Sequence, residues 1–462
     1  MNNMIARLEK VEITNFKNVR HGEITFENHK ESYNSSILGL YGQNGSGKTV
    51  LIDAIWLLKL ALSGLKIPSY FADFINIDVP SAKLNYRFKV QDSETSEKYV
   101  ADYEFIIEKA ADESDSNIKQ NNLPTKYKTV IKDEILSYSY ESDEKKQKLQ
   151  PVINTKISKV FGPTSKYKIL VGSKKELIPN LMSYKNLTFA DSRSFIFSME
   201  FLNILHQNCT EEYHWNLLES LVRYGNFELF VINGLNAMNM LPLPLKESDI
   251  IYSLGKNLLM INLNTTTLIP KIALNTVNKV VTNMNIVLSQ LVPSLKIDLK
   301  NLGDELLQNG TTASKIQLVS QKNNREIPLQ YESEGIKKII SILPLLILVY
   351  NNNSITVAID ELDSGVFEYL LGEILRIISE KGKGQLIFTS HNLRPLETID
   401  RSFIAFTTTN PDKRYIRLTN LKTTNNLRDF YYRDIILGEQ KEPLYDTTHN
   451  SEIAFALREA GK

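Results

Sequence analysis

A short glycine-rich segment near the N-terminus holds the first residues whose types and spacing could do chemistry. Residues 42–49 read GQNGSGKT and fit the pattern G-x-x-x-x-G-K-[ST]. Glycines let the backbone turn tightly and direct its N–H groups at phosphate oxygens, and a following helix adds its positive N-terminus. The pattern predicts a loop that binds the phosphates of a nucleoside triphosphate through Gly42, Asn44, Gly45, Ser46, Gly47, Lys48 and Thr49.

Two side chains of this loop have separate roles. Lys48 would reach the β- and γ-phosphates, and the Thr49 hydroxyl would hold Mg²⁺. A chance match in a glycine-containing turn is the alternative. It is disfavoured because the segment follows an apolar run at 36–42 and opens a stretch with apolar residues at helical spacing.

An apolar strand that ends in two carboxylates supplies the second group. Residues 355–361 read ITVAIDE. A buried strand delivers Asp360 to the carboxyl edge of a parallel sheet, where ligands bind in open α/β folds, so Asp360 is predicted to hold Mg²⁺. Glu361 is predicted to polarise the attacking water as a general base. Taken alone, the segment could also be a strand followed by an acidic turn, and the phosphate loop favours the catalytic interpretation.

Three smaller signals surround the acidic strand. Ser333 and Gly335 form a Ser-x-Gly at the start of a predicted helix, Asp363 follows Glu361 closely, and His391 ends an apolar strand. Each signal is weak alone, because Ser-x-Gly is an ordinary helix N-cap and a histidine at a strand end is more often structural.

Hydrophobic periodicity predicts the elements that must position these residues. Period-two alternation predicts two strands within residues 8–27 and a β-meander within 84–140, and apolar runs predict strands at 36–42, 355–360 and 386–391. Helices are predicted at about 49–62, within 195–292, at about 333–350 and after the acidic strand, and Pro293 ends the middle group. The polar stretches 110–126 and 141–148 are predicted to be loops.

This order predicts an α/β chain with three regions. An N-terminal lobe, 1–194, holds the phosphate loop and the β-meander, a helical insertion covers 195–293, and a C-terminal lobe, 294–462, holds the acidic strand. A chain of 462 residues is long enough for each region to bury its own core.

Composition narrows the class of protein. Hydrophobic residues make up 42% and charged residues 23%, which is usual for a soluble globular chain, and the net charge of +1 gives no global basic field. The single cysteine, Cys209, excludes an internal disulfide framework and fits a reducing cytosol. The charged N-terminus and the lack of an 18-residue apolar run predict a cytoplasmic protein without a membrane partner.

In this order the motifs resemble those of the ABC-type ATPases, which have a phosphate loop, a signature Ser-x-Gly, an Asp-Glu strand, a D-loop and a switch histidine. Within that class the chain resembles the SMC-like and RecF-like group of the AAA family. The residues that carry this likeness are Asn15, Phe16 and Lys17 before the phosphate loop and the run GKTVLIDAI, 47–55, after it. The fold implied is an ABC-type ATPase head, in which a P-loop sheet is joined by an N-terminal antiparallel β-meander and a short helical insertion.

The resemblance implies a head-to-head homodimer, or a higher homo-oligomer, with ATP and Mg²⁺ between subunits. ATP would lie between the phosphate loop of one subunit and Ser333 and Gly335 of the other. His391 would contact the γ-phosphate from its own subunit, and Asp363 would report across the interface. Asn15, Phe16 and Lys17 are expected in the nucleotide site, and hydrolysis assisted by Lys48, Glu361 and His391 is expected to be slow and regulated.

The chain also departs from the ABC pattern. Gln91 is the only early candidate for a Q-loop glutamine, and it lies within a predicted strand, so it is not assigned. Glu334 stands where transporters have a second signature glycine, which weakens a transporter analogy. No heptad pattern is sustained, so the long coiled coils of SMC rods are excluded.

The β-meander, the insertion and the run ESEG at 332–335 resemble the OLD-like ATPases (overcoming lysogenization defect), which are common in bacterial antiphage systems. OLD nucleases append a Toprim domain that needs clustered carboxylates. Acidic residues after His391 are scattered, so this domain is expected to be absent and its work to be done by a separate nuclease or toxin. The leading hypothesis is an ATP-hydrolysing sensor or scaffold of an abortive-infection type defence system that controls such an effector.

Two other functions remain open at this point. One is a RecF-like DNA-repair ATPase, and the other is a scaffold that binds ATP with little turnover. Lysines within 151–176 could contact DNA phosphates or form a solvated sheet edge. Arginines and aromatic residues within 425–433 could bind a partner or form an ordinary amphipathic terminal helix.

Overall fold

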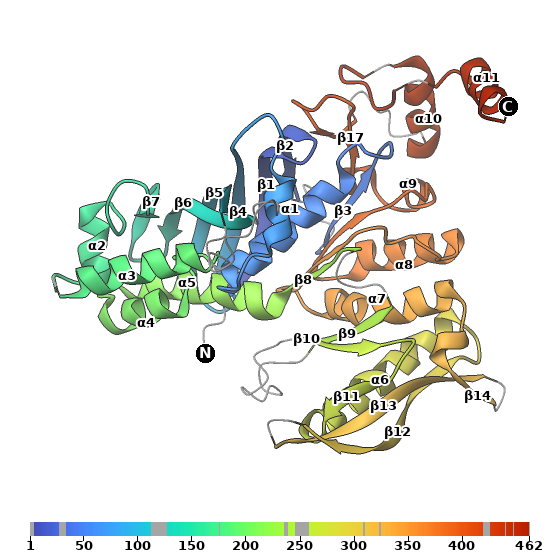
Figure 1. Ribbon diagram of the computed structural model, residues 1–462, viewed down its shortest axis with the longest axis horizontal. Coiled ribbons are helices and arrows are strands. Elements are labelled where there is room, and N and C mark those ends of the chain that lie inside the picture. Colours follow the sequence, from blue (N-terminus) through green and yellow to red (C-terminus); the bar gives the residue numbers. More distant parts are fainter. Residues whose placement is uncertain are drawn as a thin grey trace, which may run out of the picture.

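The computed structural model describes residues 4–26, 34–111, 127–174, 176–234, 239–244, 258–307, 310–322, 325–418, 426–438, 440–446 and 448–461. The chain forms a mixed α/β fold in which an antiparallel sheet and a mainly parallel sheet lie next to each other (Figure 1). Helix α1 (Lys48–Leu62) lies with these sheets, and its residues belong to a hydrophobic core shared with both. The predicted α/β class is therefore confirmed.

The antiparallel sheet has the strand order β2-β1-β4-β5-β6-β7. Buried and partly exposed residues alternate along its strands, as expected for a sheet with one face on the core. The strands are β1 (Met4–Phe16), β2 (Val19–Thr25), β4 (Ser81–Asp92), β5 (Lys98–Ala111), β6 (Tyr127–Glu141) and β7 (Lys146–Asn154). The predicted β-meander is present, and most of the loop predicted at 110–126 lies outside the described residues.

The mainly parallel sheet has the order β18-β17-β3-β16-β15-β8. Only β18 is antiparallel to its neighbour, and the central strands are almost wholly buried, which explains their uninterrupted apolar sequences. The strands are β3 (Ser36–Tyr41), β8 (Leu229–Ile232), β15 (Thr356–Ile359), β16 (Gln385–Thr389), β17 (Ile404–Thr407) and β18 (Tyr415–Ile416). The phosphate loop follows β3 and the acidic pair follows β15, so both lie at the carboxyl edge of this sheet.

Residues 195–293 differ from a purely helical insertion. Helices α4 (Met199–Asn208) and α5 (Glu212–Arg223) lead through a π-helical turn at 224–228 into β8, which pairs with β15 in the central sheet. The same span holds the hairpin β9 (Met240–Pro244) and β10 (Leu258–Asn262), strand β11 (Thr267–Pro270) and helix α6 (Lys271–Leu291). Part of this span is therefore a strand of the mainly parallel sheet. The sequence did not indicate this strand, because a four-residue apolar run after a helix is too short to show its own periodicity.

A third sheet packs with α6 beside helix α7 (Glu334–Asn351), below the central sheet in Figure 1. Its order is β11-β13-β12 with β14 paired to β13. These strands are β12 (Lys296–Leu306), β13 (Thr312–Lys322) and β14 (Arg325–Pro328). Helix α7 therefore connects the third sheet to the edge of the central sheet that holds the acidic pair.

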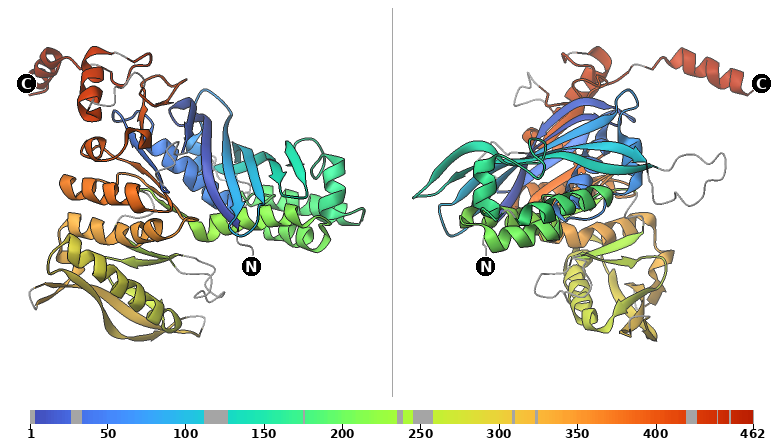
Figure 2. Two further views of the ribbon diagram at one scale, coloured as in Figure 1. Left: turned by 180° about the vertical axis from the view of Figure 1, so that it is seen from behind. Right: turned by 60° about the vertical axis from the view of Figure 1, so that its left-hand side comes forward.

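The remaining helices cover the outer parts of the chain. They are α2 (Thr164–Val171), α3 (Leu177–Ala190), α8 (Glu368–Lys381), α9 (Pro395–Thr398), α10 (Leu427–Leu437) and α11 (Asn450–Ala460). Helix α11 stands away from the rest in both views of Figure 2, and none of its residues is buried. No described helix is both long enough and apolar enough to cross a membrane.

Candidate active site

The phosphate loop lies between β3 and α1 and has the backbone of an anion-binding turn. Gly42, Gly45 and Gly47 all have positive φ, a conformation that favours glycine. A Cβ added at Gly42 would overlap the hydroxyl of Thr407 on β17. Thr407 also hydrogen bonds to the Ser46 side chain, so the C-terminal part of the chain supports the loop from behind.

Residues just after β17 continue this support. The Tyr415 hydroxyl donates to the carbonyl oxygen of Gly47 at 3.0 Å. The Arg414 guanidinium donates to the carbonyl oxygens of Thr408 and Asn18, each at 2.6 Å. These contacts join the phosphate loop, the β1–β2 turn and the C-terminal segment into one unit.

Lys48 folds back over the phosphate loop. Its Nζ donates to the carbonyl oxygens of Gly42 at 2.8 Å and Gln43 at 3.0 Å. Burial lowers the pKa of Lys48, and the negative charges of Asp360 and other nearby carboxylates oppose that shift. The Lys48 ammonium therefore lies at the phosphate loop, where phosphate oxygens could replace its two carbonyl contacts.

Thr49 and Asp360 meet although they lie far apart in the sequence. The Thr49 hydroxyl is 3.3 Å from Asp360 Oδ1, and the Thr389 hydroxyl donates to the same oxygen at 2.5 Å. The Asp360 N–H donates to the carbonyl oxygen of Ile232 on β8, which fixes the end of β15. A hydroxyl and a carboxylate are hard oxygen ligands, and with phosphate oxygens they form a donor set that fits Mg²⁺.

Glu361 has an unusual backbone conformation. Its φ is 47°, a left-handed value that costs energy in a residue with a side chain. Its N–H donates to the Thr389 hydroxyl at 2.8 Å, which holds this turn against β16. Its carboxylate makes no hydrogen bond or ion pair with the described residues.

Asp363 organises the segment that carries His391. Asp363 Oδ2 accepts the N–H groups of His391 at 3.0 Å and Asn392 at 2.8 Å. Its Oδ1 is buried without a hydrogen-bond partner among the described residues. Asp363 therefore fixes the loop after β16 within the same subunit, in addition to the interface role implied by the resemblance.

A cavity of about 350 Å³ brings the predicted residues together. Those that line it are Lys17, Asn44, Gly45, Gly47, Lys48, Thr49, Asp360, Glu361 and His391. Those that do not line it are Asn15, Phe16, Gly42, Ser46, Ser333, Gly335 and Asp363. Gly42 and Ser46 shape the phosphate loop without lining the cavity, whereas Ser333 and Gly335 lie at the start of α7, where Gly335 is next to Gly365.

The Asn15–Lys17 segment has a mixed role. Asn15 and Lys17 have positive φ, and Phe16 is fully buried against Phe71 and Phe74. Phe16 is thus a core side chain and cannot contact a nucleotide directly in this conformation. The Lys17 ammonium lies 3.7 Å from the ring centroid of Phe74 and pairs with a buried carboxylate on α1.

That carboxylate is Asp53, which the sequence reasoning did not assign. It lies one helical turn after Thr49, is 2% exposed and accepts a hydrogen bond from Asn233 at 3.4 Å. Burial raises the pKa of Asp53, and its bond to Lys17 opposes that shift. The i, i+4 spacing from Thr49 was the available signal, because it places both side chains on one face of α1.

Thr389 is the second unassigned residue. It contacts both residues of the acidic pair and ends β16, two positions before His391. A hydroxyl at a strand end has no distinctive spacing, so only its position before the histidine could have indicated it.

The signature segment caps helix α7. Ser333 Oγ accepts the N–H of Ile336 at 3.4 Å, so Ser333 is the N-cap. A Cβ at Gly335 would overlap the carbonyl oxygen of Gly365, which has a φ of 76°. Helix α7 and the segment after the acidic pair are therefore in direct backbone contact.

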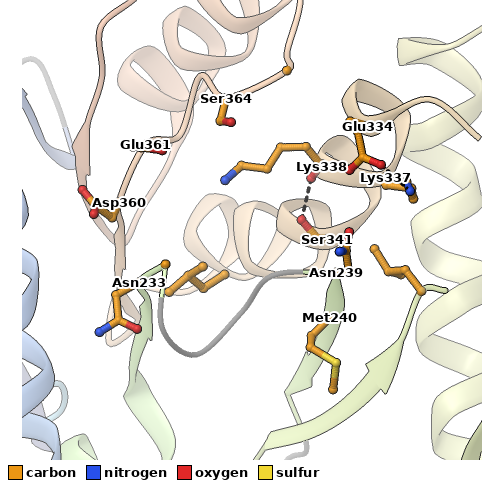
Figure 3. Close-up of a pocket in the computed structure, with 14 residues that line it drawn as sticks. Asn233, Asn239, Met240, Glu334, Lys337, Lys338, Ser341, Asp360, Glu361 and Ser364 are labelled. Atoms are coloured by element: carbon orange, nitrogen blue, oxygen red, sulfur yellow. Dashed lines mark hydrogen bonds and ion pairs between the residues drawn. The ribbon is translucent and has the colours of Figure 1, made fainter. Parts of the chain in front are cut away.

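A second cavity, of about 270 Å³, lies on the side of the acidic pair that faces α7 (Figure 3). Asp360 and Glu361 line both cavities. The other polar residues around the second cavity are Asn233, Asn239, Glu334, Lys337, Lys338, Ser341 and Ser364.

Comparison with solved structures finds similar chains that align over most of their length. An Smc head bound to the C-winged helix domain of ScpA has 12% identity and a TM-score of 0.39, with 89% of this chain and 98% of that chain covered. The recombination mediator protein RecF has 13% identity and a TM-score of 0.37, with 90% and 99% covered. An SMC head domain from Thermotoga maritima has 14% identity and a TM-score of 0.32, with 89% and 99% covered.

No curated protein matches the chain. A family model described as AAA ATPase domain matches residues 7–394. This match spans most of the 462 residues and includes the phosphate loop, the acidic pair and His391. The chain belongs to the AAA ATPase domain family.

Proposed function

We propose that this member of an ATPase family hydrolyses ATP slowly in an ATP-sandwiched homodimer and controls a separate effector in a bacterial antiphage defence system. The observation that carries the ATPase part is the approach of the Thr49 hydroxyl to Asp360, 3.3 Å apart, beside Lys48 and Glu361 in one cavity. This arrangement supports phosphate binding and water activation at the same point.

The roles of the residues follow from their places around the cavity. Lys48 would exchange its two carbonyl contacts for phosphate oxygens, which offer stronger, charge-assisted hydrogen bonds. Thr49 and Asp360 would hold Mg²⁺, which supplies charge neutralisation at the phosphates when bound. Glu361 would accept the proton of the attacking water, and His391 would contact the γ-phosphate.

The dimer part of the proposal is supported by the surface around the signature. Ser333 and Gly335 do not line their own phosphate cavity, and the exposed Ser333 is accessible to another subunit. Exposed aromatic residues flank them and the acidic turn: Tyr331 is 72% exposed and Phe367 is 70% exposed. Exposed aromatic side chains of this size are common at protein interfaces.

The cellular role rests on the resemblance to the OLD-like ATPases. The effector would be a nuclease or toxin, and ATP turnover or a phage trigger would release or activate it. Residues within 425–433 were expected to offer the effector a surface of arginine and aromatic side chains, and only some of these side chains are exposed. Tyr431 packs on Phe406 in the core and Arg428 pairs with Glu397, whereas Tyr432 remains 46% exposed.

Hydrolysis of ATP by the purified protein tests the proposal. Wild type should release phosphate in a Mg²⁺-dependent reaction, and Glu361→Gln should be slower by about 10²- to 10⁴-fold, the usual contribution of a general base. A Glu361→Gln variant with the wild-type rate would remove Glu361 from the mechanism.

The role in defence needs a separate experiment. A culture that carries the native locus should limit phage spread at low multiplicity of infection, and Lys48→Ala should remove that protection. Loss of phage protection in Lys48→Ala, together with an ATPase rate that DNA does not change, would support the role in defence. Hydrolysis stimulated by DNA, with salt-sensitive binding and no effect on phage survival, would instead support a repair ATPase.

A further inference from the structure

The carboxylate of Glu361 needs an orienting group that the proposed mechanism does not supply. A general base works when a neighbouring group holds it in one orientation. The backbone of Glu361 is fixed by Thr389, but its carboxylate has no hydrogen bond or ion pair among the described residues. The candidates are the cations that line the two cavities that meet at Glu361.

Three of the four lysines that line these cavities are already engaged. Lys17 pairs with Asp53, and Lys48 donates to two carbonyl oxygens of the phosphate loop. Lys337 pairs with Glu334 and donates to Asn264 at 3.3 Å. None of these ammonium groups is therefore available to Glu361 without breaking a contact.

Lys338 is the fourth. It makes no side-chain hydrogen bond or ion pair with the described residues, and Figure 3 shows it extending from α7 across the second cavity toward Asp360 and Glu361. Burial lowers the pKa of Lys338, and the carboxylates of Asp363, Glu361 and Asp360 oppose that shift. The field at its ammonium thus comes from the acidic segment.

The backbone of α7 also holds Lys338 in this position. Gly335, one turn before Lys338, lies so close to the carbonyl oxygen of Gly365 that a Cβ would not fit there, so the start of the helix packs directly on the segment after the acidic pair. Asp363 is a less suitable target than Glu361, because two backbone N–H groups fix its Oδ2, its Oδ1 is buried, and Asp363 lines neither cavity, whereas Glu361 lines both.

We propose that Lys338 is a positioning residue for hydrolysis, which acts from the signature helix by orienting the Glu361 carboxylate. This inference rests on the proposed role of Glu361 as general base. Lys338 itself touches neither ATP nor the attacking water, and its effect passes through Glu361. The helix that carries Ser333 would thereby also set the reactivity of the acidic pair in its own subunit.

Steady-state kinetics and ATP binding of Lys338→Met and Lys338→Arg test this role. Lys338→Met should lower kcat by about 10-fold, the scale of one screened charge interaction, and leave ATP affinity within about 2-fold. Lys338→Arg should recover most of the rate because it keeps the charge. Equal loss in both variants, or a loss confined to ATP affinity, would overturn the proposal.

Lys337→Met is the matched control. It removes a lysine from the same turn of α7, but one whose ammonium pairs with Glu334 instead of facing the acidic pair. Its kcat should stay within about 2-fold of wild type once thermal melting shows that each variant is folded. A loss equal to that of Lys338→Met would show that any lysine of this turn is required and would contradict the specific role.

A double-mutant cycle separates this inference from the proposed function. In single-turnover reactions, Lys338→Met should have no further effect in a Glu361→Gln background, because the group that it orients is gone. A full additional loss in that background would overturn the positioning role and leave the base assignment intact. Wild-type hydrolysis by Glu361→Gln alone would overturn the base assignment.

Discussion

The backbone of Glu361 and the side chain of Lys48 are both held by contacts within the chain. Glu361 adopts a left-handed backbone, and Lys48 is kept over the phosphate loop by two carbonyl groups. Strain of this kind persists only where surrounding contacts maintain it, and here Thr389 supplies the contact at Glu361.

The first prediction concerns Lys48. Lys48→Ala removes charge-assisted contacts to phosphate worth about 1.5–3 kcal/mol each. ATP affinity should fall by about 100-fold, as measured by calorimetric titration. Lys381→Ala, a change at an exposed lysine at the end of α8, is the control and should bind ATP as wild type does. Unchanged affinity in Lys48→Ala would contradict the phosphate-loop assignment.

Among single residues, the sequence allowed prediction of those that belong to a motif with a fixed spacing. The phosphate loop, Asp360 and Glu361 could be placed because each follows a recognisable strand. Asp53 and Thr389 could not, because their importance comes from neighbours on other elements. Phe16 is the reverse case: the sequence motif placed it in the nucleotide site, but its side chain is buried in the core.

Helix α7 is the element that connects the most parts of the site. Its N-terminus carries the signature, its first turn touches the segment after the acidic pair, and its buried face packs in the core that includes the third sheet. Helix α7 therefore links the signature residues and the acidic segment to the core of the third sheet.

The second prediction follows from the contact between α7 and Gly365. Gly335→Ala places a methyl group on the Gly365 carbonyl oxygen, so the helix must shift. Unfolding free energy should fall by about 1–3 kcal/mol and ATP hydrolysis should be impaired, as checked by chemical denaturation and a phosphate-release assay. Gly234→Ala, where an added Cβ would have no described atom within 4 Å, should change neither quantity.

The third prediction concerns helix α5 and the antiparallel sheet. His214 is fully buried and hydrogen bonds to Tyr138, and burial lowers its pKa to about 3. The unfolded chain therefore binds the proton first, and the stability contributed by neutral His214 is lost as pH falls below about 6.5.

Between pH 7.5 and pH 5.0 this single group should cost wild type about 2 kcal/mol of unfolding free energy. His214→Gln does not titrate, so its stability should change less over the same interval. Denaturant titrations at both pH values provide the measurement, and parallel losses in the two proteins would exclude His214 as the source.

Element prediction from the sequence succeeded where the periodic pattern was long. Helices α1 and α7 and strands β1 to β6 lie close to the expected ranges, whereas the loop predicted at 141–148 is shorter than expected because β7 begins at Lys146. Strand β8 was not anticipated, because its four residues are defined by pairing with β15. Helices α2 and α3, within the predicted N-terminal lobe, also lacked a clear apolar stripe.

The whole molecule has two candidate groups of nucleotide contacts, and only one of them lines the phosphate cavity. The phosphate loop opens into one cavity, and the signature residues lie outside it. In the proposed ATP sandwich, a second copy would bring the signature residues to the nucleotide.

The fourth prediction is ATP-dependent association. Glu361→Gln should approximately double in mass with Mg-ATP, because slow hydrolysis preserves the closed state, and mass-resolved sizing in solution measures this. Ser333→Arg in the same background should remain at the lower mass, since a bulky cation would occupy the proposed contact. A mass that does not respond to ATP would contradict the sandwich.

The support of the phosphate loop by Thr407, Arg414 and Tyr415 has a consequence for where the catalytic module ends. These residues lie beyond residue 394, the last residue matched by the family model, yet they contact Ser46, Asn18 and Gly47. A truncation at residue 394 would keep every recognised motif but remove the three side chains that hold the phosphate loop and the β1–β2 turn in place. The smallest fragment that retains a formed phosphate loop should therefore extend at least through β18.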